Sequence, residues 1–416
     1  MAQIAPFRGV RYVLSDLRQC VAPPYDVITP PERDKLRQFP CNMTHLTLPD
    51  RYDLAGSLWR QWQEQGILRA DPEPAMYLLE QRFTHPVTGE RCRRLALVCL
   101  MALEEYGTGV VLPHENTQAK AKEDRLQLLR ATRANLEPIY GLVEGELFPV
   151  LDELVHTAPL IAEVEYTDGL HRLHRMEEPA ALERTRELVA PARVWIADGH
   201  HRYETSLQYR RERRAAEGNP ETLQPYDWLM IALTPFDDPG VVILPTHRVL
   251  PSASDHALAR LPQWLAEWFD LQACAPQEVA GLLRQGGARR GFGVVLRGGR
   301  AFIAWLKPGV APETLVPGEH SPAYRQLDVT LLQALVLEPL FGITHHHLER
   351  AEGIRYTRDE REAIERVLSG DSAVAFLLNP PTVLEVREVA LAGEKMPPKS
   401  TYFYPKLLSG LVMRAL

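Results

Sequence analysis

The sequence predicts an α/β protein with mixed sheets, made of a larger N-terminal body and a second, smaller α/β domain. Short apolar segments rich in β-branched residues alternate with longer segments whose apolar residues recur every three or four positions. The chain has 416 residues, which is more than one hydrophobic core usually supports. The composition changes near Pro251, so we place the body at residues 1–250 and the second domain at residues 251–416.

The composition is typical of a globular protein that works in the cytoplasm. Hydrophobic residues make up 45% of the chain, and no apolar run approaches the roughly 20 residues of a membrane helix. A net charge of −7 argues against nucleic acid as a partner. The five cysteines are odd in number and form no Cys-x-x-Cys pair, so we expect no disulfide framework and no zinc. Haem and flavin are not expected either, and the oligomeric state stays open.

A strand, a glycine turn and a helix form the segment around which the chain is organised. Residues 194–196 are apolar and β-branched or aromatic, which predicts a short buried strand. Gly199 tolerates the backbone angles that a tight turn requires. The helix that follows carries Tyr203 and Leu207 on one face. Polar residues between these two elements therefore lie where a strand ends and a helix begins.

This turn predicts an anion site. The first backbone N–H groups of a helix have no acceptor within it, and the helix dipole adds positive charge there. Two imidazoles and a guanidinium stand at the same point, which favours phosphate as the ligand. The residues of this site are Asp198, Gly199, His200, His201 and Arg202. In the alternative interpretation, Asp198 caps the helix and Arg202 pairs with a surface carboxylate.

A second cluster of polar residues lies at residues 114–125. It surrounds the start of a helix that we predict to end near residue 133. His114 and Glu115 precede this helix and would form an acid–base pair. Lys122 and Arg125 are three positions apart and therefore neighbours on one helical face, where they would neutralise phosphate. A solvated, charged helix is the alternative interpretation of the same pattern.

Asp26 is a third candidate for chemistry. Pro23 and Pro24 hold the segment before it extended and stiff. A carboxylate presented in this way suits a general base or an Mg²⁺ ligand. A plain turn capped by Asp26 has the same sequence pattern.

Further cations follow in the second half of the chain. The strand predicted from residue 240 onward ends in His247 and Arg248. Residues 396–406 combine prolines with aromatic side chains, so we expect this segment to return to the first domain and pack there, with Lys399 and Ser400 as further anion ligands. His201 and Arg202 follow the strand at 194–196 in the same way. If these two strands are adjacent, the cations of both His-Arg pairs would face one crevice.

Four blocks resemble the domain-of-unknown-function family 1015. They are Val-Ala-Pro-Pro-Tyr-Asp-Val at 21–27, Ala-Asp-Gly-His-His-Arg-Tyr at 197–203, Leu-Pro-Thr-His-Arg at 244–248 and Met-Pro-Pro-Lys-Ser-Thr-Tyr-Phe-Tyr-Pro-Lys at 396–406. The Asp-Gly-His-His-Arg core is also similar to the phosphate-binding box of the ParB/sulfiredoxin superfamily, which includes partition nucleotidases, sulfiredoxins and free-serine kinases. This second resemblance implies a ParB/sulfiredoxin-like anion-binding core.

These groups favour a phosphoryl-transfer enzyme, either a kinase or a phosphatase, that acts on a small phosphorylated metabolite. Glu115 and His114 would transfer protons, with His200 as a further catalytic candidate, and Asp26 would orient the substrate or hold Mg²⁺. The resemblance to free-serine kinases implies serine or phosphoserine as the substrate and ATP or ADP as the nucleotide. The sequence does not decide between Asp26 and Glu115 as the base.

Two other functions stay open. A nucleotide-binding regulator related to ParB partition proteins would need a helix-turn-helix and a basic face, which the acidic balance disfavours. A sulfiredoxin-like reductase would need a cysteine near the anion box. None lies within 198–202, although Cys20 is close in sequence to Asp26.

Overall fold

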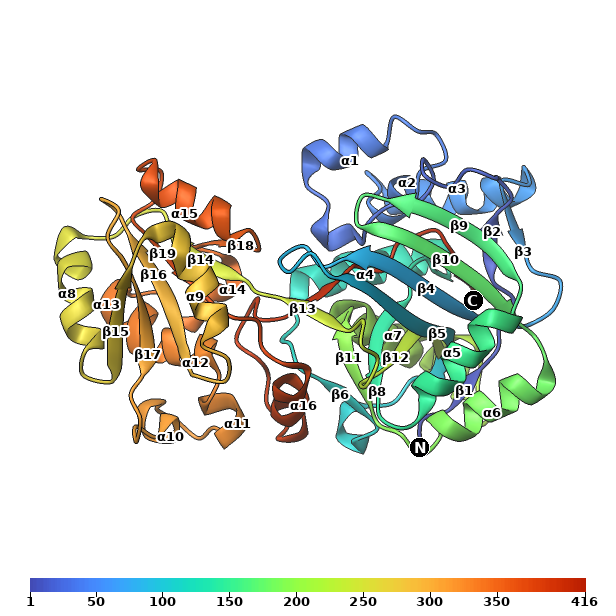
Figure 1. The fold of residues 1–416 in the computed structure, drawn as a ribbon. Helices are drawn as coiled ribbons and strands as arrows, with labels where there is room; N and C mark the ends of the chain where they lie inside the picture. The colour runs from blue at the N-terminus through green and yellow to red at the C-terminus, as the bar shows by residue number, and fades with distance from the viewer. The chain divides into compact units, whose positions relative to one another are not determined.

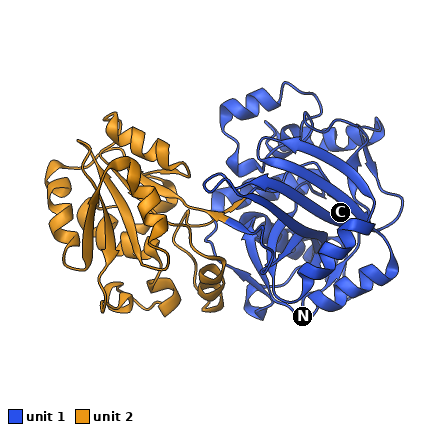
Figure 2. Cartoon of the chain, viewed as in Figure 1, with its two compact units in different colours: residues 1–242, 405–416 blue, residues 243–404 orange.

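The computed structural model describes residues 1–416, and the chain divides into two compact units. The first unit combines Met1–Val242 with Pro405–Leu416, and the second is Ile243–Tyr404 (Figure 2). The second unit is therefore an insertion in the chain of the first. None of the helices is both long and apolar enough to cross a membrane.

A mixed nine-stranded sheet forms the centre of the first unit (Figure 1). Its strands are β1 (Ile4–Ala5), β4 (Met76–Thr84), β5 (Arg91–Ala102), β6 (Val111–Pro113), β8 (Ile139–Val143), β9 (Leu160–Tyr166), β10 (Gly169–Met176), β11 (Val194–Asp198) and β12 (Trp228–Pro235). Their order is β6-β11-β8-β12-β5-β4-β10-β9, and β1 pairs with β5. The β6–β11 and β8–β12 pairs are parallel and the other pairs are antiparallel. The mixed sheet predicted from the sequence is thus confirmed.

Helices and two small sheets complete the first unit. The helices are α1 (Pro30–Leu36), α2 (Thr44–Thr47), α3 (Tyr52–Glu64), α4 (Ala119–Thr132), α5 (Leu147–Thr157), α6 (Pro179–Val189) and α7 (His200–Ala216). Apolar side chains of α5, α6 and α7 pack with those of the strands in one buried cluster. In the small sheets, β2 (Val10–Tyr12) pairs with β3 (Leu68–Ala70), and β7 (Ala134–Asn135) pairs with β21 (Arg414–Ala415). The last of these pairs ties residues 405–416 into the first unit.

The second unit is built on a six-stranded antiparallel sheet. Its strands are β14 (His247–Leu250), β15 (Phe269–Cys274), β16 (Gly291–Leu296), β17 (Ala301–Leu306), β18 (Arg355–Thr357) and β19 (Val374–Leu377), in the order β15-β17-β16-β19-β14-β18. The helices are α8 (Asp255–Leu265), α9 (Val279–Gln285), α10 (Pro312–Leu315), α11 (Pro322–Arg325), α12 (Asp328–Leu332), α13 (Glu338–Phe341), α14 (His345–Arg350), α15 (Glu360–Leu368) and α16 (Val383–Leu391). Apolar residues of α9 and α15 pack with the strands to form the core of this unit. A short sheet of β13 (Val242–Leu244) and β20 (Tyr402–Tyr404) stands at the boundary of the units.

The strand predicted from residue 240 through Arg248 is wrong in one respect. The structure has two strands there, β13 and β14, because Pro245 offers no backbone N–H to a sheet and interrupts the run. His247 and Arg248 consequently begin a strand inside the second unit, where both are buried, instead of standing at the end of a strand.

Candidate functional site

The polar candidates of the first unit meet at one edge of the nine-stranded sheet. β6 and β11 are parallel neighbours with Pro113 opposite Ile196, so the residues that follow both strands emerge together. β8 is antiparallel to β11, with Tyr140 opposite Asp198, so the residues that precede β8 reach the same edge. This topology gathers three segments that are far apart in sequence.

The predicted strand, glycine turn and helix are confirmed at this edge. β11 ends at Asp198, and α7 begins at His200. Gly199 lies between them with φ 95°, and no side chain caps the first turn of α7. A Cβ atom at Gly199 would lie 2.9 Å from Nη2 of Arg202. Glycine is therefore favoured both by its backbone angle and by the close approach of the guanidinium.

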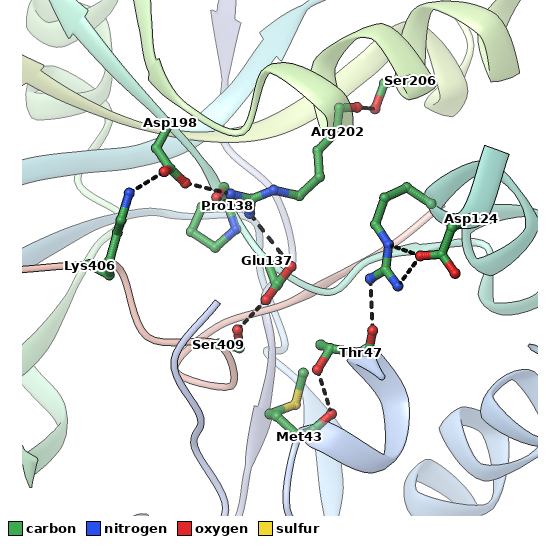
Figure 3. A network of polar contacts seen from close by, with 11 residues as sticks. Met43, Thr47, Asp124, Glu137, Pro138, Asp198, Arg202, Ser206, Lys406 and Ser409 are labelled. Atoms are coloured by element: carbon green, nitrogen blue, oxygen red, sulfur yellow. Dashed lines mark hydrogen bonds and ion pairs between the residues drawn. The ribbon is translucent and has the colours of Figure 1, made fainter. Parts of the chain in front are cut away.

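Arg202 is held by acceptors of its own unit (Figure 3). Its Nη2 donates to Oδ2 of Asp198 at 3.0 Å, and its Nη1 donates to the carbonyl of Pro138 at 2.8 Å. The carboxylate of Glu137 lies 3.7 Å from Nη1. Burial lowers the pKa of Arg202, but Glu137 and Asp198 raise it above its usual value. The predicted alternative of a surface carboxylate partner does not match these contacts, since Glu137 is 8% exposed.

A second cation reaches the same turn from the distant C-terminal segment. Lys406 forms an ion pair with Oδ1 of Asp198, the carboxylate whose other oxygen binds Arg202 (Figure 3). Burial alone would raise the pKa of Asp198, but Lys406 and Arg202 hold it below its usual value. Ser409 of the same segment donates to Glu137 at 2.5 Å. Residues 405–416 thus help to build the turn.

Glu115 lies between two buried imidazoles. His114 and His200 are 0% and 2% exposed, and their rings meet edge to face at 4.7 Å. Oε2 of Glu115 is 3.6 Å from Nδ1 of His200, and Oε1 is 4.0 Å from Nε2 of His114. The backbone N–H of His114 donates to Nε2 of His200 at 3.2 Å. In the neutral ring this bond places the proton on Nδ1, facing Glu115.

Glu204 connects α7 to the start of α4. One of its oxygens accepts from Nζ of Lys122 at 3.0 Å and from the hydroxyl of Thr117 at 2.6 Å. The backbone N–H of Gln118 donates to Nε2 of His201 at 3.0 Å. His201 and Lys122 therefore stand on facing elements, within one turn of the start of each helix.

Arg125, which lies three positions after Lys122 on α4, has different partners. Arg125 is buried, donates to the carbonyl of Thr47 at 2.7 Å and stacks over the ring of Tyr25 at 4.0 Å. Asp26 follows Tyr25 and is exposed, and its charge contributes to the raised pKa of Arg202. The structure thus groups Asp26 and Arg125 on the Arg202 side of the site.

Two cavities flank the contact between α4 and α7, and Thr205 lines both. The larger has a volume of about 450 Å³ and is lined by Glu105, Tyr106, Ala119, Lys122, Glu123, Leu126, Glu204, Thr205, Leu207, Gln208 and Arg211. The smaller has a volume of about 60 Å³ and contains the side chains of Arg125, Glu137 and Arg202 in its wall. Only the larger cavity has the size of a pocket for a small organic ligand, which is typically about 300–1,000 Å³.

No group of three or more His, Cys, Asp or Glu side chains is arranged to hold a metal ion. Asp26 therefore does not belong to a protein-built metal cage. Mg²⁺ usually keeps several waters and binds through one or two carboxylates plus substrate phosphates. That Asp26 binds Mg²⁺ stays a prediction.

The other predicted ligands belong to the second unit: His247, Arg248, Lys399 and Ser400. That they share a crevice with the first unit stays a prediction. The sequence reasoning did not select Glu137, Lys406 or Glu204. Lys406 stands at the end of the block 396–406 that resembles the family pattern, which was a usable signal, whereas Glu137 carries no distinctive pattern.

The comparison with solved structures finds chains with a distant likeness to this one. A conserved hypothetical protein from Pyrococcus furiosus has 14% identity and a TM-score of 0.34, with 72% of this chain and 89% of that chain covered. A free serine kinase in complex with AMP has 14% identity and a TM-score of 0.34, with 71% and 83% covered. SbnI from Staphylococcus aureus, with a C-terminal truncation, has 9% identity and a TM-score of 0.36, with 75% and 85% covered.

The comparison with curated proteins gives no significant match. The family described as "Protein of unknown function (DUF1015)" matches residues 4–330, which is most of the chain. The family resemblance read from the four sequence blocks is thereby confirmed. The chain belongs to the DUF1015 family.

Proposed function

We propose that the first unit, with a ParB/sulfiredoxin-like anion-binding core, carries a phosphoryl-transfer enzyme for a small hydroxyl-bearing metabolite. The observation that supports this most directly is Glu115, placed within 4.0 Å of two buried imidazoles beside the first turn of α7. A carboxylate, two histidines and a helix N-terminus supply a base and an anion site at one place. Serine or phosphoserine and an adenine nucleotide are the substrates that we propose to test first.

In this proposal Glu115 is the general base. A hydroxyl that attacks phosphorus has to lose its proton to a group within hydrogen-bond reach. The Nδ1 proton of His200 faces Glu115 and orients the carboxylate, while His114 fixes the tautomer of His200 through its backbone N–H. His114 and His200 are then positioned to stabilise the carboxylate before transfer and to share the proton afterwards.

The phosphate is bound at the start of α7 in this proposal. Backbone N–H groups of the first turn and the helix dipole favour a negative charge there. Lys122 supplies a further donor from the facing helix, and His201, whose Nε2 accepts the backbone N–H of Gln118, lies beside it. Arg202 acts as a positioning residue, because its two Nη groups already bind Asp198 and Pro138 and hold the glycine turn.

The larger cavity between α4 and α7 is the proposed nucleotide pocket. Its volume of about 450 Å³ suits a nucleoside, and Lys122 and Glu204 stand both in its wall and beside the phosphate site. Tyr106 offers an aromatic wall, since its ring stacks on Tyr203 at 5.4 Å between centroids. Any Mg²⁺ would enter with the nucleotide phosphates, with Asp26 as its one candidate protein ligand.

The direct test is an activity screen of the purified full chain by ³¹P NMR. Serine would be offered with ATP or ADP, and phosphoserine would be offered with and without nucleotide, so that kinase and phosphatase activities are distinguished. AMP and ADP binding would be measured by calorimetry for the wild type, Lys122→Met and the control Lys120→Met, which changes an exposed lysine on the same helix. Loss of binding in Lys122→Met alone supports the pocket. No transfer together with equal binding by both variants contradicts the proposal.

A further inference from the structure

Arg248 is a buried cation without a carboxylate partner. Its residue is 1% exposed in the second unit, within β14. Nη1 donates to the carbonyl of Thr246 at 2.5 Å, and Nη2 makes one long bond of 3.3 Å to the carbonyl of Pro398. The ring of Tyr356 lies 5.7 Å from the guanidinium carbon. Two carbonyls and an aromatic face leave the full positive charge uncompensated.

The free hydrogen-bonding capacity of Arg248 lies on one edge of its guanidinium. Nε is buried and has no hydrogen-bond partner, and its neighbour Nη2 holds only the long bond to Pro398. Nε and Nη2 together form the edge through which arginine binds two oxygens of one carboxylate or phosphate. The same edge binds both carboxylate oxygens of a partner in Arg18 with Asp16 and in Arg214 with Asp227.

Arg248 lines a cavity of about 30 Å³ that is built only from the second unit. A cavity needs a volume of roughly 10–15 Å³ to hold one water molecule. The cavity beside Arg248 therefore admits the charged head of a ligand and not a whole metabolite. Ser400 and Thr246 add polar groups to its wall, and Asn379 and Pro380 are half-buried at its rim.

The other charged groups of this cavity do not neutralise Arg248. Arg290 forms its own ion pair with Glu385. Asp328 accepts the backbone N–H of Gly291 at 3.0 Å and makes no ion pair with Arg248. Burial raises the pKa of Asp328 to about 7, with Arg290 lowering it and Glu385 raising it, so burial disfavours the negative charge of this carboxyl. Burial also lowers the pKa of Arg248 to about 10, which a bound anion would reverse.

We propose that the second unit holds an oxyanion site of its own, in which the Nε–Nη2 edge of Arg248 binds the phosphate or carboxylate group of a small ligand. The site does not depend on the proposed phosphoryl transfer, because every residue that forms it belongs to residues 243–404. Its role would be to recognise an anionic metabolite.

The test compares inorganic phosphate with acetate as probes on the full chain. Equilibrium dialysis in buffer free of other oxyanions would be run on wild type, Arg248→Met and the control Arg297→Met, which removes an exposed arginine of the same unit. Arg202→Met would be included so that phosphate bound in the first unit is counted separately. We expect Arg248→Met to lower the affinity for one of the two probes by roughly ten- to a hundredfold. Arg297→Met and Arg202→Met should bind that probe at the second-unit site as wild type does.

A stability measurement separates this role from a purely structural one. Methionine replaces an uncompensated buried charge by an apolar side chain of similar length, which is often neutral or stabilising. In anion-free buffer we therefore expect the Tm of Arg248→Met to equal or exceed that of wild type, and the binding probe to raise the Tm of wild type by more than it raises the Tm of Arg248→Met. Equal binding of both probes by wild type and Arg248→Met would overturn the proposal. So would a fall in Tm in anion-free buffer that Arg297→Met does not share.

Discussion

At the scale of single residues, the candidate site is built from polar side chains that are buried. His114, His200 and Arg202 are largely enclosed, yet each has a named polar neighbour. A buried polar group is costly unless it is hydrogen-bonded or paired, so such clusters are found where they serve binding or chemistry. Single substitutions at these positions therefore separate the proposed roles.

The first prediction concerns Glu115. Glu115→Gln keeps the shape of the side chain but removes the base, so we expect kcat to fall by roughly 10²–10⁴ with little change in nucleotide affinity. Steady-state kinetics with calorimetry measures both quantities. The control is Glu153→Gln, an exposed carboxylate of α5. If Glu115→Gln stays as active as the control and Asp26→Asn loses turnover at unchanged affinity, Asp26 is the base.

The second prediction concerns Gly199. An alanine there has to adopt φ near 95°, which costs about 1–2 kcal/mol, and its Cβ displaces the guanidinium of Arg202. Gly218→Ala is the matched control, since Gly218 follows α7 with φ 75° and has no atom within 4 Å of an added Cβ. Urea denaturation should give both variants a similar loss of stability. Only Gly199→Ala should also weaken nucleotide or phosphate binding, and equal binding by both variants would contradict the role of this turn.

The third prediction concerns the acid stability of the second unit. Burial lowers the pKa of His247 to about 4, and its Nδ1 accepts the backbone N–H of Leu378 at 3.2 Å. The unfolded chain binds this proton near pH 6.5, so the free energy of unfolding falls as the pH falls from 6.5 towards 4. The titration of His247 should lower the free energy of unfolding of the second unit by about 2 kcal/mol between pH 7 and pH 5.

The measurement for His247 is the stability difference between wild type and His247→Asn at each pH. Asn offers an oxygen near the position of Nδ1 but does not titrate. Asp328, with its pKa raised to about 7, acts in the opposite sense and is common to both proteins, so it cancels in this difference. The stability advantage of wild type over the variant should shrink by about 2 kcal/mol from pH 7 to pH 5. A constant difference would show that His247 takes up its proton equally in the folded and the unfolded chain, so that folding does not lower its pKa.

At the scale of elements, the local pattern in the sequence predicted the segments well. The strand, turn and helix around Gly199 follow from the apolar pattern and from the turn residue, which act over short distances. The strands that neighbour β11 in the sheet could not be predicted from local sequence patterns. β11 lies between β6 and β8, and that order is set by long-range packing of the sheet.

This difference explains which parts of the site were predicted. His114, Glu115 and His200 carry recognisable chemistry and were selected from the sequence. Glu137 binds Arg202 only because β8 starts beside the end of β11, and no local pattern contains that information. The error at His247 has the opposite origin, because Pro245 was a local signal for a break in the strand.

The fourth prediction concerns the segment that brings Lys406 to β11. Lys406→Met removes one of two cations from a carboxylate that is largely buried, while Arg202 remains paired with it, so we expect a loss of about 1.5–3 kcal/mol in the stability of the first unit. Chemical denaturation measures it, with Lys120→Met as the exposed control. In the double variant with Asp198→Asn the loss should be smaller than the sum of the two single losses. Additive losses would mean that Lys406 and Asp198 do not interact.

At the scale of the whole molecule, the chain of the first unit is interrupted by the second. Residues 405–416 supply Lys406, Ser409 and the strand β21 to a unit that otherwise ends at Val242. The second unit, by contrast, is one continuous segment with its own core. Domains with a continuous chain and a separate core generally fold alone.

The fifth prediction follows from this topology. A fragment of residues 243–404 should fold alone and unfold cooperatively, whereas a fragment of residues 1–242 should lack a stable fold. Joining residues 242 and 405 through a short Gly-Ser linker should restore the first unit, since it keeps all of that unit's own contacts. Circular dichroism and thermal denaturation distinguish these outcomes. A stable, cooperative fragment 1–242 would contradict the importance of residues 405–416.

The insertion also sets an order of events during protein synthesis. The ribosome completes residues 243–404 before it makes residues 405–416, and domains generally fold as units while the chain is still growing. The second unit can therefore fold before Lys406 has been synthesised and has paired with Asp198. A nascent chain that stalls anywhere before Lys406 leaves the proposed phosphate turn without its second cation. Translation of residues 405–416 is thus the step that supplies the last contacts of the turn at which we propose that phosphate binds.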